Sequence, residues 1–411
     1  MNTPKRLFLF GALLACAACV LASPAAADEI VVRDLATGQE STITCSEVTS
    51  ETWSEVKYKE RQRSAEKSVP TLTVVSVSRG DKSANAQSLE SAMGDLKRGN
   101  YKEAARVLQS ISGGGWKVDL ETGERKYVSF SANDPKGRNK RPPWISEYSH
   151  FYYAKAKYLL GAKNKDRDLV EAAYLALDDV QVPGGEIKTG GFLGRFAGGN
   201  SRFYPEAMAL KGKALVFLAR YDDATKVFQD LHKAAIRVPL DPMWAYEGLI
   251  GGGSIAEAKG DLTGAVEGYR GAIPTMEVLL GQETRSYMRQ RFGRYYSQAR
   301  MRVAAVKLQA AEKRKAPAAF ADLRQWIQGG MPEAIRRRAK SKGMPAESIS
   351  ALVAGARDPA VQAVAYNGLG LAYLNEPKPK YEDAMLACLL YTSDAADEGV
   401  EGGGGGGGGG G

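Results

Sequence analysis

The chain has 411 residues, of which 44% are hydrophobic and 25% are charged, and its formal net charge is +9. This composition excludes a disordered chain and suffices for one large domain or for two or three ordinary ones. The chain has two histidines and four cysteines, and Cys45 is the only cysteine between residues 28 and 387. A disulfide framework and a metal site built on several His or Cys ligands are therefore excluded, and we predict neither metal nor cofactor.

The first 27 residues have the pattern of an export signal. Lys5 and Arg6 precede an apolar run over residues 7–21, and the alanines at 25–27 offer a small-residue cleavage site. The run is short for a membrane span, which needs about 20 apolar residues. A lipoprotein processed at Cys16 is the alternative, because the four residues that end there resemble a lipobox. The protein is predicted to be exported to the periplasm or cell envelope.

Residues 28–80 are predicted to form a small β-rich module. Short runs rich in β-branched and aromatic residues occupy 30–32, 41–44, 53–59 and 71–77, with polar turn material between them. The alternation Val56-Lys57-Tyr58-Lys59 points the two lysines outward. Four or five short strands suggest an SH3-like or Sm-like barrel or a curled sheet. Such a module could bind a peptide, a glycan or the cell surface, and nothing in its sequence selects one.

From residue 84 onward, Ala-rich segments with apolar residues at helical spacing alternate with short polar turns. Three strings share one layout: Gly99-Asn-Tyr-Lys-Glu-Ala104, Ala219-Arg-Tyr-Asp-Asp-Ala224 and Gly260-Asp-Leu-Thr-Gly-Ala265. They resemble the turn between the two helices of a tetratricopeptide repeat (TPR), a unit of about 34 residues. Residues 84–387 are therefore predicted to form a TPR-like α-α solenoid of an exported bacterial type, and the whole fold to be mostly α.

The resemblance implies a packing role for each matched position. A small residue in the first helix lets the two helices approach, an alanine in the second helix packs against it, and a bulky residue four positions later fills the space toward the next repeat. The predicted repeat-packing residues are Ala92, Gly99, Tyr101, Ala104, Leu108, Gly212, Tyr221, Ala224, Phe228, Gly253, Gly260, Ala265, Tyr269, Leu369, Gly370, Tyr373 and Ala384.

The repeat spacing is irregular, and two looser copies complete the array. One is a helix pair over 152–160 and 169–180 with a lengthened turn between; the other starts at Tyr366. Segments 113–144 and 183–201, rich in Gly, Lys and Arg, are predicted to be insertion loops.

The C-terminal segment 388–411 is interpreted as an artefact. Its first ten residues can be encoded by a transposon-type sequencing adapter, and its last ten are all glycine, the translation of a G homopolymer. A Gly-rich linker is the alternative. We expect the natural chain to continue past Ala387, so that the solenoid is cut inside its last repeat.

The basic charge is concentrated between residues 285 and 342, which hold sixteen Lys or Arg and three Asp or Glu. Clustered basic residues favour an anionic partner, and export argues against nucleic acid. An acidic protein, an anionic lipid surface or an anionic wall polymer fits better, and a merely solvated helix face is the alternative. The candidate contacts are Arg285, Arg289, Arg294, Arg336, Arg337 and Arg338.

Catalytic motifs are missing from the sequence: it contains no G-x-S-x-G and no H-E-x-x-H. Dispersed carboxylates, as in glycoside hydrolases, are the catalytic arrangement that one sequence leaves open. The TPR resemblance implies a scaffold whose concave face, lined by the first helices, accepts a peptide. We therefore predict a non-enzymatic scaffold that recruits protein or peptide partners at the cell envelope. The alternative is an envelope-structural protein that docks on anionic lipid or wall polymer through residues 285–342.

Overall fold

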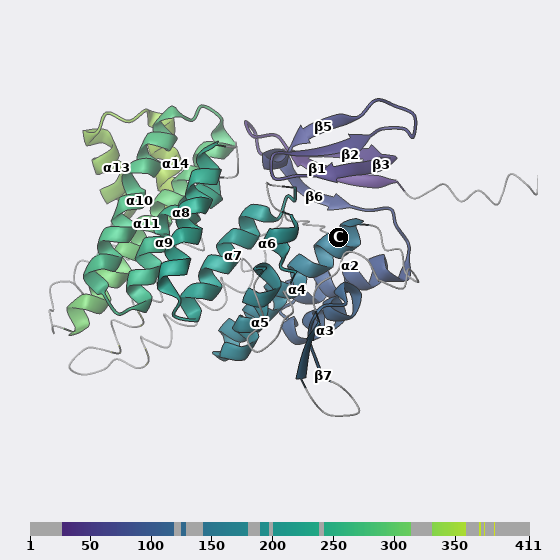
Figure 1. The fold of residues 1–411 in the computed structure, drawn as a ribbon. Helices are drawn as coiled ribbons and strands as arrows, with labels where there is room; N and C mark the ends of the chain where they lie inside the picture. The colour runs from purple at the N-terminus through teal and green to yellow at the C-terminus, as the bar shows by residue number, and fades with distance from the viewer. Residues whose placement is uncertain are drawn as a thin grey trace, which may run out of the picture.

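The computed structural model describes residues 27–118, 125–128, 143–179, 190–196, 200–237, 242–313 and 331–358, together with positions 370, 374 and 382. Over these residues the chain is mostly helical, with antiparallel sheets toward its N-terminal end, as the sequence predicted (Figure 1). Residues 1–26 of the predicted signal peptide and the adapter-like segment lie outside the described residues. So do three predicted packing residues, Leu369, Tyr373 and Ala384.

The β-rich module contains six strands in two antiparallel sheets. They are β1 (Asp28–Arg33), β2 (Glu40–Cys45), β3 (Glu47–Glu51), β4 (Glu55–Lys59), β5 (Lys67–Pro70) and β6 (Val74–Ser78), with the 3-10 helix η1 (Thr71–Thr73) before β6. One sheet has the order β2-β1-β6 and the other β3-β4-β5. Only Ser46 separates β2 from β3, so these strands run on from one sheet into the other. Ile30, Val48, Val56 and Tyr58 belong to the core of the module.

The strand pattern was predicted in part. Val56 and Tyr58 are buried while Lys57 and Lys59 are half-exposed, which confirms the alternation in β4. The sequence missed β3 and β5, because both are short and each contains only one apolar β-branched residue, Val48 in β3 and Val69 in β5. The run predicted at 71–77 divides into η1 and β6, with Pro70 closing the edge strand β5, where a missing N–H group costs no ladder hydrogen bond.

The helices follow from residue 84. They are α2 (Ala84–Lys97), α3 (Tyr101–Ser112), α4 (Pro143–Asn164), α5 (Arg167–Leu177), α6 (Phe192–Arg195), α7 (Tyr204–Phe217), α8 (Tyr221–Arg237), α9 (Pro242–Ala258), α10 (Leu262–Gln282), α11 (Ser286–Lys313), α13 (Met331–Ser341) and α14 (Ala346–Ala356). The predicted insertion loops are not wholly loop. A hairpin of β7 (Gly115–Val118) and β8 (Arg125–Val128) lies in the first, and α6 lies in the second.

Five inter-helix turns in the described residues share one geometry. Each has a residue with positive φ, and the next amide donates to the carbonyl five residues earlier at 2.8–3.1 Å, which is the Schellman pattern. The positive-φ residues are Gly99, Lys165, Ala219, Gly260 and Gly343. These turns join α2 to α3, α4 to α5, α7 to α8, α9 to α10, and α13 to α14. The array is thus built from helical hairpins that the chain closes in the same way each time.

The turn between α4 and α5 is tighter than the sequence suggested. The predicted lengthened turn began at Gly161, but α4 continues to Asn164 and only two residues separate the helices. A Cβ on Gly161 would lie 2.7 Å from Cγ2 of Val170, so glycine permits the close approach of the two helices there. The prediction that Gly161 belongs to the turn was wrong, because this glycine lies inside α4 and serves helix packing.

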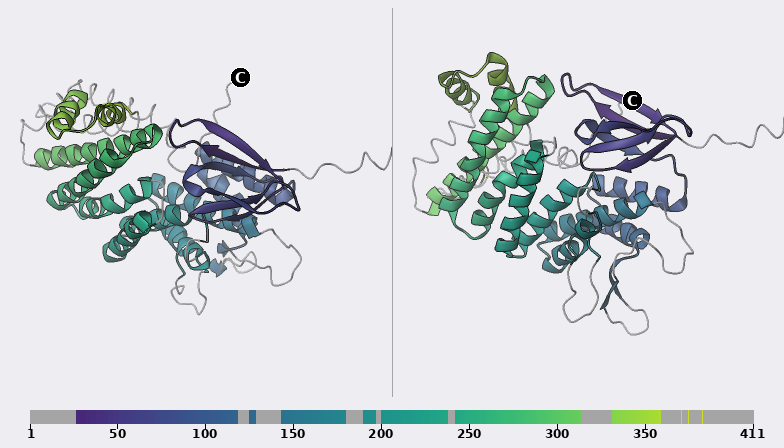
Figure 2. Two further views of the ribbon diagram at one scale, coloured as in Figure 1. Left: turned by 90° about the horizontal axis from the view of Figure 1, so that it is seen from above. Right: turned by 45° about the horizontal axis from the view of Figure 1, so that its top comes forward.

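Two hydrophobic clusters divide the helices. The first extends from Ala86 to Leu231, with Ile255, and the second from Tyr246 to Ala356. Figures 1 and 2 show the module lying along one edge of the helical array, above the first helices and beside the start of α11.

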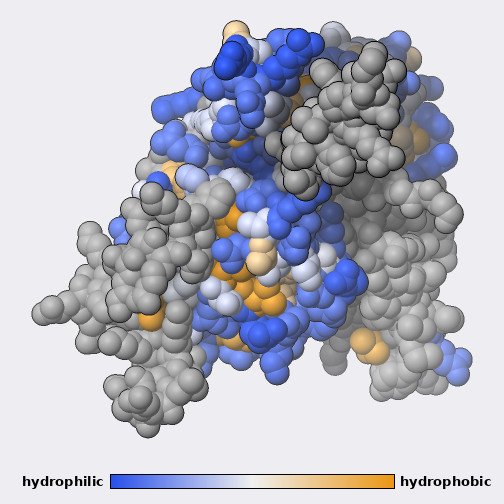
Figure 3. Space-filling model, turned by 90° about the vertical axis from the view of Figure 1, so that its right-hand side faces the viewer, coloured by the Kyte–Doolittle hydropathy of each residue, from blue (hydrophilic) through white to orange (hydrophobic). Residues whose placement is uncertain are grey.

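Among the described helices, none combines the length and the apolar character needed to cross a bilayer. The face shown in Figure 3, on the side of the module, is largely hydrophilic with an apolar area near its centre.

Candidate functional site

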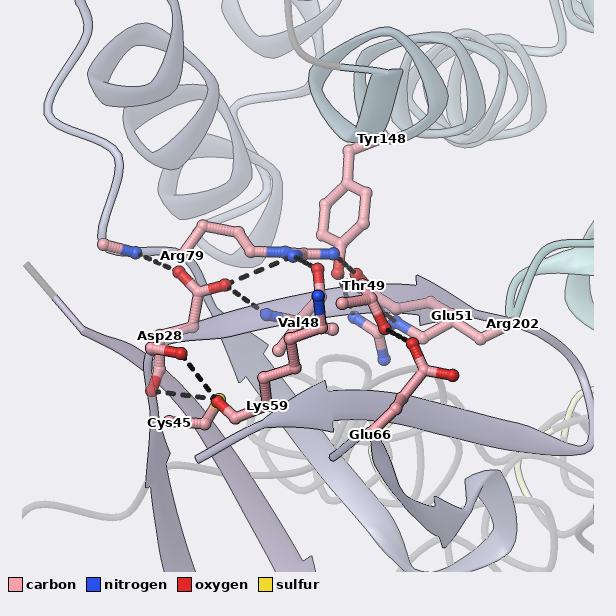
Figure 4. Close-up of polar contacts among 12 residues, drawn as sticks. Asp28, Cys45, Val48, Thr49, Glu51, Lys59, Glu66, Arg79, Tyr148 and Arg202 are labelled. Atoms are coloured by element: carbon pink, nitrogen blue, oxygen red, sulfur yellow. Dashed lines mark hydrogen bonds and ion pairs between the residues drawn. The ribbon is translucent and has the colours of Figure 1, made fainter. Parts of the chain in front are cut away.

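A buried polar network lies where the module meets the helices, and its centre is Glu51 (Figure 4). This residue ends β3, and 2% of its side chain is exposed. Its carboxylate accepts a hydrogen bond from the Tyr148 hydroxyl at 2.7 Å and pairs with Nε of Arg202 at 2.6 Å. Arg79, just after β6, pairs with the other carboxylate oxygen. One carboxylate therefore holds together the module, α4 and the segment before α7.

Asp28 extends this network to the first residue of β1. Its carboxylate accepts the backbone N–H groups of Val48 and Gly80, both at 2.8 Å, and pairs with Arg79 at 3.3 Å. Arg79 also donates to the carbonyl of Val48. These contacts tie the start of the module to its end. Cys45 lies beside them, and burial raises the pKa of its thiol, which makes it a weak nucleophile.

Two further titratable groups lie on α4, the helix that carries Tyr148. Glu147 accepts a hydrogen bond from Ser201 at 2.5 Å, and burial raises the pKa of its carboxyl group to about 7. His150 is fully buried, with Nε2 2.7 Å from the carbonyl of Ala176, and burial lowers the pKa of its ring to about 3. The neutral ring donates from Nε2 and accepts at Nδ1 from Arg195, 3.3 Å away.

We call this charged network the clamp; its members are Asp28, Glu51, Arg79, Tyr148 and Arg202. The module also packs on α7. Trp53 meets the ring of Tyr204 edge-on, with 5.5 Å between ring centroids. The guanidinium of Arg79 lies over Trp144, at the start of α4. The clamp thus joins the module to the first hydrophobic cluster.

A second contact joins the module to α11. The backbone N–H of Tyr287 donates to the carbonyl of Ala36 at 3.2 Å, and the Ser286 hydroxyl donates to the same oxygen. Arg33 hydrogen-bonds the Tyr287 hydroxyl, and its guanidinium lies 5.1 Å from the ring centroid. Tyr287 lies at the margin of the second hydrophobic cluster, as do Leu35 and Leu72 of the module. The module therefore bridges the two clusters.

Ion pairs connect the first helices of successive hairpins. Lys155 on α4 pairs with Glu206 on α7 at 2.7 Å, and Lys213 on α7 pairs with Glu247 on α9 at 3.1 Å. The largely buried Arg302 on α11 lies over the ring of Tyr269, 5.4 Å from its centroid. We call the pairs Lys155–Glu206 and Lys213–Glu247 the inner ladder, which links α4, α7 and α9.

The predicted packing residues that the structure describes occupy contact positions. Ala92, Ala104, Leu108, Ala224, Phe228, Ala265 and Tyr269 are buried, as are the helical glycines Gly212, Gly253 and Gly370. A Cβ on Gly212 would lie 2.7 Å from the Phe228 ring, and one on Gly253 would lie 2.5 Å from the Tyr269 ring. Gly99 and Gly260 form turns, and Tyr101 and Tyr221 are half-buried beneath Lys163 and Lys259. Small and bulky residues therefore face each other across the hairpins.

The six candidate anion contacts come from two regions of the chain. Arg285 immediately precedes α11, and Arg289 and Arg294 lie within it, whereas Arg336, Arg337 and Arg338 lie on α13. Arg285 pairs with Glu283, Arg294 with Asp358, Arg336 with Glu333 and Arg338 with Glu277. Arg337 is exposed, as is the neighbouring Lys340. Acidic residues outside the basic stretch therefore neutralise part of its charge.

Sequence reasoning missed the clamp completely. Its residues come from β1, β3, the end of β6, α4 and the segment before α7, so no local spacing joins them. Among the described residues, no three His, Cys, Asp or Glu side chains gather in a way that could hold a metal ion. Comparisons with protein-family models, with curated proteins and with solved structures find no match to this chain.

Proposed function

We propose that this protein is an exported scaffold of the tetratricopeptide repeat type, which recruits a protein or peptide partner at the cell envelope and is not an enzyme. The observation that carries the proposal is the inner ladder. It aligns the first helices of three hairpins, α4, α7 and α9, by charged pairs. In the TPR family these helices line the concave face that accepts a peptide.

Two further observations support a repeat scaffold. The same left-handed turn closes hairpin after hairpin, and a small residue faces a bulky one at Gly212–Phe228 and at Gly253–Tyr269. Stacked units that bury their apolar faces against neighbours are the basis of a solenoid. For the N-terminal module we propose an SH3-like barrel, because β2 and β3 pass from one sheet to the other and η1 precedes β6, which pairs with β1.

Site-specific photo-crosslinking in cells tests this proposal. A photoreactive amino acid replaces Lys213 on α7, a first helix, in one strain and Lys233 on α8, a second helix, in another. These side chains are 42% and 64% exposed, so the control position is the more accessible one. We expect a discrete cross-linked species from position 213 and none from 233. Equal cross-linking from both positions, or none from either, contradicts a first-helix binding face.

The alternative function is docking on anionic lipid or wall polymer through α13, where Arg337 and Lys340 are exposed. Sedimentation of the full chain with anionic vesicles over a salt series tests it. Lipid docking predicts binding that falls with salt and is lost in an Arg337→Glu/Lys340→Glu variant. An Arg106→Glu variant, altered at an exposed arginine of α3, is the matched control. Absence of binding at low salt rules out docking on anionic lipid.

A further inference from the structure

The contact between the module and α11 has the form of a receptor filled by a single side chain. The ring of Tyr287 lies against Gly38, whose φ is +80°, and a Cβ there would be 2.8 Å from Cδ2 of the ring. Arg33 covers the ring and bonds its hydroxyl, and Leu35 and Leu72 lie at the margin of the same cluster. We call Arg33, Leu35, Gly38 and Leu72 the cradle.

The cradle differs from the clamp in what its loss would expose. The clamp contains the buried carboxylates of Asp28 and Glu51, which cannot lose their cationic partners without a large desolvation penalty. The cradle holds one half-buried ring, that of Tyr287, and the side chain of its own Arg33 is 21% exposed. Opening the cradle leaves each polar group within reach of water, so the cradle can open while the clamp stays closed.

We propose that the cradle is a recognition site for a tyrosine side chain, filled here by Tyr287 of the same chain and open to exchange with a tyrosine-bearing segment of a partner protein. Arg33 selects the ring through its face and its hydroxyl group, and Gly38 leaves the space that the ring occupies. The carbonyl of Ala36 accepts from the backbone and from Ser286, so a hydroxyl residue before the tyrosine adds to recognition.

Competition within the chain sets the strength of exchange. Tyr287 is held next to the cradle by the folded array, so it competes as an intramolecular ligand with any free segment. A partner segment therefore binds weakly while Tyr287 fills the cradle, and more tightly once that side chain is removed. This behaviour distinguishes a recognition site from a permanent packing contact.

The test uses a fluorescent synthetic peptide of residues 283–292 and the full chain. We expect the peptide to bind a Tyr287→Ala chain at least tenfold more tightly than the wild type. A peptide with alanine in place of tyrosine should bind that chain at least tenfold more weakly. A Tyr221→Ala chain, which loses a half-buried tyrosine at the start of α8, should behave as the wild type does. Equal binding by the wild-type and Tyr287→Ala chains overturns the proposal.

Hydrogen exchange on the unmodified chain provides a second test that needs no variant. The amide of Tyr287 is bonded to Ala36, whereas the amides of Val48 and Gly80 are bonded to Asp28 in the clamp. We expect the Tyr287 amide to exchange at least tenfold faster than the other two, and excess peptide to increase that exchange. Exchange of Tyr287 as slow as that of Val48 would show that cradle and clamp open together, which contradicts the proposal.

Discussion

The two hydrophobic clusters hold their neighbouring elements together in different ways. The first is joined to the module by buried charges, with Glu51 as the shared acceptor for Arg79, Arg202 and Tyr148. The second brings backbones together at glycines: a Cβ on Gly293 of α11 would lie 2.4 Å from the carbonyl oxygen of Ala351 on α14. One arrangement requires every partner to be present, and the other requires side chains to be absent.

The two kinds of contact are sensitive to different changes in sequence. A buried ion network fails when one member is removed, because the remaining charges stay buried without a partner. A glycine contact fails when an atom is added, because close-packed helices must then move apart. Loss of one charged partner should therefore weaken the contact between the module and the first cluster, whereas addition of one methyl group should weaken the contact between α11 and α14.

The largest effect is expected at the centre of the clamp. In a Glu51→Gln chain, Arg79 and Arg202 lose their shared carboxylate while they stay largely buried. Breaking a buried ion pair in this way costs about 3–5 kcal/mol. Urea unfolding of the variant and the wild type measures the difference. A loss below about 1 kcal/mol, typical of exposed pairs, would mean that the clamp does not distinguish the first cluster from the second.

The next largest effect is expected in the pH dependence of stability, through Glu147 and His150 on α4. The pKa of Glu147 is raised to about 7 from its ordinary 4.5, so its contribution to stability is complete below pH 4.5 and is lost as the pH rises through 7. The pKa of His150 is lowered to about 3 from 6.5, so its contribution is complete above pH 6.5 and is lost as the pH falls toward 3. Between pH 4.5 and 6.5 the two slopes oppose each other.

A Glu147→Gln substitution removes one of these opposing slopes. The unfolding free energy of the variant, relative to the wild type, should fall by about 2 kcal/mol between pH 6.5 and pH 4.5, at 1.36 kcal/mol per pKa unit and with partial titration at both ends of the range. Urea unfolding at both pH values checks this difference. A constant offset between the two chains would show that Glu147 is not protonated more readily in the folded state.

A smaller effect is expected from adding one methyl group to the contact between α11 and α14 in the second hydrophobic cluster. The Cβ of a Gly293→Ala chain meets backbone atoms of α14, and overpacking of this kind costs about 1–3 kcal/mol. Gly252→Ala is the matched control, because no atom lies within 4 Å of its Cβ position in the helix α9. Alanine there should raise stability by up to about 1 kcal/mol through helix propensity. Thermal unfolding of both variants should therefore give shifts of opposite sign.

The smallest effect is expected at the exposed ion pairs on the helices of the second hydrophobic cluster. Arg336 and Glu333 on α13 pair at 2.6 Å, with side chains 43% and 51% exposed. Such pairs contribute about 0.3–0.5 kcal/mol. An Arg336→Ala chain should unfold within that margin of the wild type in urea. A loss comparable to that of Glu51→Gln would remove the contrast between buried and exposed charge.

The sequence predicted those parts of the fold that depend on neighbouring residues. Three hairpin turns were visible because each combines a turn residue with an alanine five positions later. The turn at Lys165 was predicted only as part of a lengthened turn between residues 160 and 169, and the turn at Gly343 was missed. Neither has the alanine five positions later, where Val170 and Ser348 stand instead. Local pattern thus predicts a repeated turn only where the residue types repeat as well.

The clamp and the charge pairing could not be predicted in this way. Tyr148 and Arg202 meet Glu51 across 97 and 151 positions of the chain, and only the docking of the module brings them together. The basic stretch was recognised from its own residues. The acids that neutralise it, such as Glu277 and Asp358, lie outside its bounds and meet it only through helix packing.

Two of the left-handed turns are places where a substitution should increase the stability of the chain. Ala219 and Lys165 have φ values of 61° and 55°, which side-chain-bearing residues adopt at a cost of about 1–2 kcal/mol. Both residues are exposed, so glycine at either turn would lose little contact while relieving the strained backbone. Each turn is therefore a site where one substitution should raise the melting temperature, and where a weakened variant could be rescued without altering clamp, cradle or ladder.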